Sequence, residues 1–219
     1  KVLGPLLERL AEEAQGEFRL AKLNVDENPN LAIRYGVRSI PAVKAFRNGQ
    51  MIAEFVGVQP EPRLREFLRS IAPSESDLLV EKGSSQLSLL RSQQAEQTFR
   101  QALEVTPGNS AALLGLAKSL LLQGKGKESL HILAGFPTSR EFKSASILLP
   151  LAQALDAFEH NQGDPSEDAL DAAFQQAMRL VKRGNLEAAM DGLLDILREN
   201  KRYRGDKARQ AMLGLLEIL

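Results

Sequence analysis

Residues 22–57, KLNVDENPNLAIRYGVRSIPAVKAFRNGQMIAEFVG, decide the fold of the N-terminal third of the chain. Within this segment Asn48-Gly49 separates two extended runs, residues 41–47 and 50–56. Because a type I′ turn needs φ > 0 at both central residues, Asn-Gly between apolar runs predicts a two-residue β-hairpin. Ile40-Pro41 stands at the start of the first strand, where proline costs no ladder hydrogen bond. An X-Pro bond is also the one place where a cis peptide is cheap.

The segments on either side of the hairpin predict an α/β unit. Residues 18–25 predict a strand, and residues 28–35 predict a short helix. Apolar residues recur at helical spacing in residues 1–14 and again in residues 61–71, so a helix is expected at each end of the unit. Residues 72–76, Ala-Pro-Ser-Glu-Ser, read as a short breaker and linker. We therefore place a domain boundary there, which divides residues 1–72 from residues 73–219.

The second part of the chain predicts an all-α domain of tetratricopeptide (TPR) type. From Asp77 onward helical periods replace strand patterns, and three partial repeats occur with a period of about 34 residues. The first is Ala95-x3-Phe99-x2-Ala102-x4-Pro107, with Gly83 at the small position of its preceding helix. The other copies cover residues 110–136 and 174–201. An unmatched helix is expected over residues 141–159, where Pro150 should end or kink it, and a loop over residues 161–165.

Composition excludes several classes of function. The 28 Lys and Arg residues balance the 28 Asp and Glu residues, so no overall field favours nucleic acid or an anionic membrane. No apolar run reaches the ~18 residues of a membrane span, and no signal peptide is expected. Cysteine is absent, which excludes disulfides, thiolate nucleophiles and cysteine-bound metals from these residues. His131 and His160 stand alone, and we expect neither a metal site, nor a cofactor, nor catalytic residues.

One local excess of positive charge covers residues 198–209, which contain six basic and two acidic residues. A solvated helix end with its loop is one interpretation, and a surface for an acidic partner is the other.

The stretch VDENPNLAIRYGVRSIPAVKAFRNGQ resembles the second half of a thioredoxin, and the resemblance covers roughly residues 1–72. It implies a cis Ile40–Pro41 bond beside the redox site. It also implies that the loop formed by Ser39, Ile40, Pro41 and Ala42 contacts thiol or peptide substrates through its backbone. The alternative for this loop is a rigid turn that starts a strand.

The same resemblance implies a thioredoxin-like domain that is truncated at its N-terminus. In thioredoxins the segment similar to residues 1–14 directly follows the Cys-x-x-Cys motif, so the first strands, the central strand and that motif would be missing. Without the central strand, residues 18–25 and the hairpin lack a common neighbour, which leaves backbone groups unpaired. An upstream segment, a distorted N-terminal third or a strand from another chain are the alternatives.

The whole chain resembles the bacterial chaperedoxins of the YbbN/CnoX type. The resemblance rests on the order of the two regions, on RYGVRSIP at residues 34–41 and on RGDKARQAM at residues 204–212. It implies a cytoplasmic co-chaperone that holds unfolding client proteins and passes them to the chaperonin and the Hsp70 system. Family members usually continue past the equivalent of Leu219 into a helix that docks on the chaperonin, so such docking by these residues is in doubt.

Three functional hypotheses follow. The first is a non-enzymatic holdase, for which the apolar stripe of Met212, Leu215, Leu216 and Leu219 is a candidate protein-binding surface. Burial as the last packed helix is the alternative for that stripe. The second is a thioredoxin-type thiol-disulfide oxidoreductase whose Cys-x-x-Cys lies upstream, with TPR helices that choose the partner. The third is a generic TPR scaffold with one defined partner.

Overall fold

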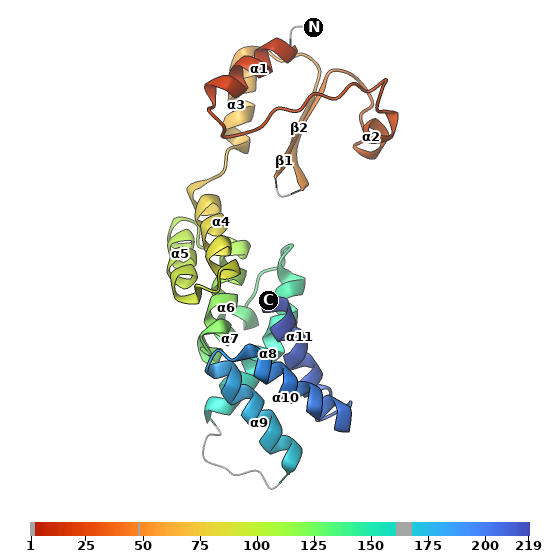
Figure 1. The fold of residues 1–219 in the computed structure, drawn as a ribbon. Helices are drawn as coiled ribbons and strands as arrows, with labels where there is room; N and C mark the ends of the chain where they lie inside the picture. The colour runs from red at the N-terminus through yellow and green to blue at the C-terminus, as the bar shows by residue number, and fades with distance from the viewer. Residues whose placement is uncertain (1–2, 48, 161–167) are drawn as a thin grey trace. The chain divides into compact units, whose positions relative to one another are not determined.

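The computed structural model describes residues 3–47, 49–160 and 168–219, and it divides the chain into two compact units, Lys1–Pro73 and Ser74–Leu219. The first unit combines helices with a two-stranded sheet, and the second is helical, so the expected fold class is confirmed (Figure 1). Among the described residues, no helix is both long enough and apolar enough to cross a membrane.

The N-terminal unit packs two helices on one face of a β-hairpin. Its elements are α1 (Leu3–Glu13), α2 (Pro29–Arg34), β1 (Ala42–Arg47), β2 (Gln50–Val56) and α3 (Glu61–Ile71). Leu3, Leu7 and Leu10 of α1 and Leu64 of α3 form a buried cluster, and Val43 and Phe55 of the hairpin pack against it. The side chain of Tyr35, just after α2, instead meets Phe46 of β1 edge to face, with ring centroids 5.1 Å apart.

The hairpin forms as predicted, with a β-bulge that shifts its register. β1 and β2 pair in antiparallel fashion from Ala42↔Val56 to Arg47↔Gln50, with an irregularity between Ala45 and Phe46. Gly49 has the positive φ of 75° that its place in the turn requires. Asn48 lies outside the described residues.

The prediction of a strand over residues 18–25 is wrong, because this segment is not part of a sheet. In the part of the chain that the structure describes, the only sheet is the pair β1–β2. A strand is held by ladder hydrogen bonds to a neighbouring strand, and residues 18–25 have no such neighbour. Leu20 still packs against the apolar cluster of the unit, so the segment is tied down by its side chains.

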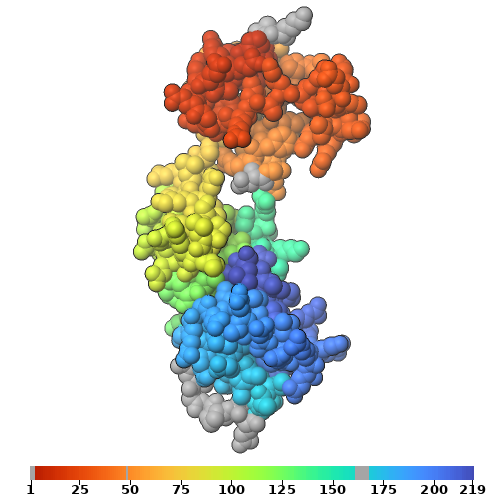
Figure 2. Space-filling view, in the orientation of Figure 1, coloured from red at the N-terminus to blue at the C-terminus, as the bar shows by residue number. Residues whose placement is uncertain are grey.

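The C-terminal unit is a series of helices in which consecutive members pack on one another, with α11 returning onto α8. The helices are α4 (Glu75–Ser88), α5 (Ser92–Val105), α6 (Ser110–Leu122), α7 (Gly126–Ala134), α8 (Phe142–His160), α9 (Ala169–Lys182), α10 (Leu186–Glu199) and α11 (Lys207–Ile218). Figure 2 shows this unit as a continuous packed body.

Side-chain caps explain several helix starts. Ser74 and Asp77 form a capping box at α4, in which each side chain accepts the other residue's backbone N–H. Asn109 and Asn185 accept backbone N–H groups in the first turns of α6 and α10.

The small and large residues of the TPR pattern meet as the repeat predicts. Ala95, Phe99 and Ala102 of α5 are fully buried. The Phe99 ring lies between Gly83 of α4 and Gly115 of α6, so close that a Cβ on Gly83 would be 2.8 Å from a ring carbon. Small residues at these two positions therefore allow three helices to pack around one aromatic ring.

Pro150 lies inside α8 and does not end it, because the helix continues from Phe142 to His160. Leu148 and Leu151 on either side of Pro150 are fully buried, and the helix packs against α7 and α11. Tertiary packing of this kind outweighs the hydrogen bond that a proline removes. The loop predicted over residues 161–165 lies outside the described residues.

Candidate functional site

The loop Ser39, Ile40, Pro41, Ala42 stands at the open end of the hairpin, and its Ile40–Pro41 peptide bond is cis, as the resemblance implied. The N–H of Gly57 donates a hydrogen bond of 2.8 Å to the carbonyl of Pro41, which ties the loop to the chain that leaves β2. Pro41 and Ala42 are half-buried, whereas 70% of Ile40 is exposed.

Two valines lie next to this loop, one at the end of β2 and one just after it. Val56 pairs with Ala42, and Val58 follows the glycine that bonds to Pro41. The exposed fractions of Val56 and Val58 are 54% and 63%. We call the set Ile40, Val56 and Val58 the hairpin-end surface.

No motif in the sequence singles out Val56 or Val58 as a site residue. A sequence signal does exist, since the antiparallel pairing across the Asn-Gly turn brings the end of the second run back to Ile40-Pro41.

The chemistry available at the hairpin-end surface is apolar contact and backbone hydrogen bonding. The chain contains no cysteine, and thioredoxin-type exchange starts from a thiolate. Among the described residues, no group of three or more His, Asp or Glu side chains is placed to hold a metal ion. The arrangement thus offers apolar contacts and backbone hydrogen bonds to an extended or apolar segment.

The structure divides the candidate stripe on α11. Met212 and Leu215 are buried in the main core of the helical unit, whereas Leu216 and Leu219 are 57% and 65% exposed. The buried face of α11 includes Gly214, which lies against Leu151 of α8, and Leu216 falls beyond the edge of that face. The four residues therefore do not form one exposed surface, and only Leu216 and Leu219, beside the exposed Leu213, face solvent.

Family models agree with this division into two regions. A thioredoxin model matches residues 1–70, and two tetratricopeptide repeat models match residues 91–139 and 151–219. The chain is thus a thioredoxin-like protein with a TPR module, a type of module that serves protein–protein interaction.

Individual relatives match one region or both. The chain is 47% identical to a thioredoxin of Chlorobaculum thiosulfatiphilum over 60 residues, which is 27% of this chain and 56% of that protein. It is 38% identical to the mitochondrial thioredoxin of Mus musculus over 71 residues, 32% of this chain and 43% of that protein. An uncharacterized protein of Mycobacterium tuberculosis is 28% identical over 217 residues, 97% of this chain and 66% of that protein. The chain therefore spans about half the length of these thioredoxins.

Proposed function

We propose that this chain acts as a holdase-type co-chaperone, which binds apolar segments of unfolding proteins without catalysing a reaction on them. The observation that carries the proposal is the hairpin-end surface, where Ile40, Val56 and Val58 stand exposed around the cis-proline loop. Clustered exposed apolar side chains in a protein of this kind mark an interaction site.

The size of this surface suits transient binding. Fully burying one valine or isoleucine side chain is worth about 1.5–3 kcal/mol, and association costs several kcal/mol before any affinity is gained. Three such side chains, which are all partly covered in the free protein, give a weak contact with little selectivity for the sequence of the client. A holdase needs this property, because its clients share apolar exposure and little else.

The TPR module supports a second contact. By the order of its regions the chain is similar to the chaperedoxins, and we propose that the helical unit mediates transfer of clients to the chaperonin and the Hsp70 system in the bacterial cytoplasm. Leu213, Leu216 and Leu219, at the C-terminal end of the described chain, are among the exposed apolar residues of this unit, and we propose them for such a contact.

The first experiment measures suppression of aggregation of a heat-unfolded client enzyme by light scattering. Ile40→Ser and Val58→Ser should each weaken suppression several-fold, because each removes exposed apolar area from the hairpin-end surface. Leu89→Ser is the matched control, since Leu89 is 62% exposed but lies in the turn between α4 and α5. Unchanged suppression by both hairpin-end variants would refute this location of the client site.

The same samples test client transfer. Addition of chaperonin or of the Hsp70 system with ATP should raise the yield of refolded client above that obtained without this protein. No suppression by the unaltered chain, together with tight binding to a single partner, would favour a generic TPR scaffold instead.

A thioredoxin-type oxidoreductase is the second candidate for the whole protein, and the similarity of residues 1–70 to thioredoxins favours it. Such an activity would draw on cysteines outside these 219 residues, because the chain has none. The insulin-reduction assay distinguishes the candidates: residues 1–219 should leave insulin turnover at the background rate while they still suppress aggregation. Turnover above background would contradict the non-catalytic proposal.

A further inference from the structure

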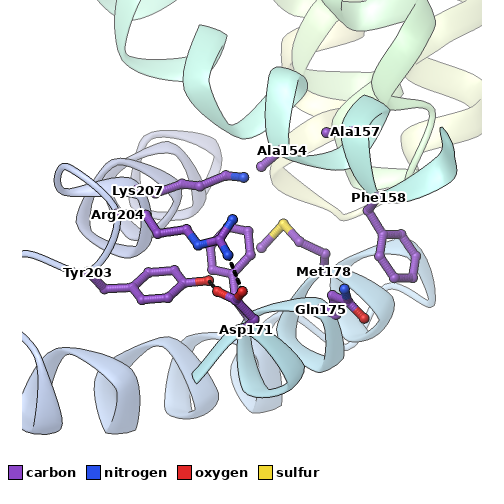
Figure 3. Close-up of a pocket in the computed structure, with 10 residues that line it drawn as sticks. Ala154, Ala157, Phe158, Asp171, Gln175, Met178, Tyr203, Arg204 and Lys207 are labelled. Atoms are coloured by element: carbon purple, nitrogen blue, oxygen red, sulfur yellow. Dashed lines mark hydrogen bonds and ion pairs between the residues drawn. The ribbon is translucent and has the colours of Figure 1, made fainter. Parts of the chain in front are cut away.

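The helical unit contains a second surface, unrelated to the hairpin-end surface, at which cavities adjoin basic side chains. A cavity of about 90 Å³ lies between α8, α9 and the segment that joins α10 to α11 (Figure 3). Its apolar side is formed by Ala154, Phe158, Phe174 and Met178, and its polar side by Asp171, Tyr203, Arg204 and Lys207. An open hollow of about 490 Å³ adjoins it across Phe158 and is lined by Arg179, Lys182 and Arg183.

Asp171 fixes the polar side of the cavity. Its carboxylate accepts hydrogen bonds from the hydroxyl of Tyr203 and from the guanidinium of Arg204. Burial, together with the negative charge of Asp171, raises the pKa of Tyr203 above its usual value, so the hydroxyl stays protonated and donates. The rings of Phe174 and Tyr203 also lie with centroids 5.6 Å apart. These contacts hold the segment between α10 and α11 on α9, and Figure 3 shows Tyr203 and Arg204 pointing at the same carboxylate.

Two of the basic side chains at the rim lie over the same aromatic rings. The ammonium of Lys207 lies 5.1 Å from the ring centroid of Phe174, and the guanidinium of Arg179 lies 5.9 Å from that of Phe158. The Arg204 side chain remains 60% exposed although it bonds to Asp171. Arg179 also donates a hydrogen bond of 2.8 Å to the side-chain oxygen of Gln176, and a cation above an aromatic ring can use its other donors for a further partner.

The charges around the two cavities do not balance. Among the described residues that line them, Arg179, Lys182, Arg183, Arg204 and Lys207 are basic, and Asp171 is acidic. Lys182 also pairs with Glu159 at 2.8 Å. Since the whole chain has no net charge, this positive excess is a local property of the surface and favours an acidic ligand.

We propose that this surface binds a short acidic peptide segment of a partner protein, in which an aspartate or glutamate neighbours an apolar side chain. The apolar side chain enters the cavity over Phe158, Phe174 and Met178, and the carboxylates pair with Lys207, Arg204 and Arg179. The smaller cavity, of about 90 Å³, has room for a small apolar group such as the end of a branched aliphatic side chain.

A peptide fits this surface better than a nucleic acid. Asp171 lies in the wall of the cavity, and Asp168 and Asp206 lie at the N-terminal ends of α9 and α11 nearby. A continuous row of phosphates would meet these carboxylates, whereas a peptide can place its carboxylates and its apolar group separately.

Fluorescence anisotropy with a short labelled peptide of alternating glutamate and leucine tests the proposal on the whole chain. We expect saturable binding that weakens as salt is added, and that is lost when glutamine replaces glutamate or serine replaces leucine. Lys207→Gln and Arg179→Gln should each raise the Kd about tenfold. Arg198→Gln removes the same charge from an exposed ion pair with Asp195 away from the cavities, and it should leave the Kd unchanged.

Several results would overturn the proposal. The first two are no saturable binding of the glutamate–leucine peptide and binding of the glutamine peptide with the same Kd. The third is an unchanged Kd in both Lys207→Gln and Arg179→Gln. The fourth is binding of single-stranded DNA with the same Kd as the glutamate–leucine peptide, which would make the surface a general polyanion site. Thermal unfolding by circular dichroism checks that each variant is folded. Ile40→Ser should leave peptide binding intact, so a failure here and a failure of the holdase proposal are distinguishable.

Discussion

At the scale of single residues, the contact between Phe99 and two glycines defines the packing of the first TPR helices. A Cβ built on Gly115 would lie 2.2 Å from Cζ of Phe99, a distance at which side chain or backbone must move. The ring is fully buried, and its neighbours Ala95 and Ala102 are buried as well. The absence of a side chain at position 115 is therefore a packing requirement.

Gly115→Ala should lower the free energy of unfolding of the helical unit by about 2 kcal/mol, the cost of overpacking a closed core. Gly192→Ala is the matched control, because a Cβ at Gly192 of α10 meets only Ala177, at the ordinary distance of 3.8 Å. This control should be neutral or stabilise the helix by up to about 1 kcal/mol. Urea unfolding followed by circular dichroism measures both, and equal effects of the two substitutions would refute the packing role of Gly115.

At the scale of elements, Glu96 of α5 connects its helix to the start of α7. Its carboxylate accepts hydrogen bonds from Lys125 at 2.7 Å, from Arg100 at 2.9 Å and from Gln123 at 2.8 Å. Burial acts to raise the pKa of Glu96, but the hydrogen bonds from Lys125, Arg100 and Gln123 outweigh it and lower the pKa from 4.5 to about 2.

The depressed pKa of Glu96 predicts a pH dependence. A carboxyl with a lower pKa in the folded state contributes stability that is fully present above pH 4.5 and is lost as the pH falls towards 2. Glu96→Gln should thus destabilise the helical unit by about 1 kcal/mol at pH 7 and by less at pH 3. Glu81→Gln, at an exposed position of α4, serves as control. A Glu96→Gln penalty that is the same at both pH values would contradict this role.

At the scale of the whole molecule, each hydrophobic cluster belongs to one unit. Residues 74–219 contain two clusters, one around Phe99 and one that includes Leu148, Leu155 and Leu193. Residues 1–73 contain a third cluster, around Leu7 and Leu64. A unit with its own core should fold without the other.

A fragment of residues 74–219 should therefore retain its helical circular dichroism and unfold cooperatively. Its transition should coincide, within a few degrees, with the main helical transition of the full chain. An unfolded fragment, or one with a much lower midpoint, would mean that the helical unit depends on residues 1–73.

Much of the fold follows from local sequence. Asn-Gly between two apolar runs predicts the β1–β2 hairpin, and helical spacing predicts α3 with the observed bounds. The pairing of small and aromatic residues in the TPR pattern places Gly83 against Phe99. These features depend on a turn, a period or a repeat, all of which lie within a few tens of residues.

The candidate site can be predicted only in part from local sequence. The resemblance to thioredoxins indicates Ile40 and Pro41 as site residues, but counting back from the turn would place Val56 opposite Pro41. The bulge after Ala45 moves that register by one residue, so Val56 pairs with Ala42 and Gly57 bonds to Pro41. The cavity proposed to bind an acidic peptide is lined by Phe158, Asp171 and Tyr203, which come from three separate segments. No local sequence pattern connects these residues.

The sequence by itself determined which segments become helix or hairpin and which residues of the repeats are small. Only the tertiary structure decided what covers each apolar face. It buries Met212 and Leu215 against α8 but leaves Leu216 exposed, and it leaves residues 18–25 without a strand partner. The physical reason is that a backbone period depends on neighbours in sequence, whereas burial and strand pairing depend on partners that are distant in the chain.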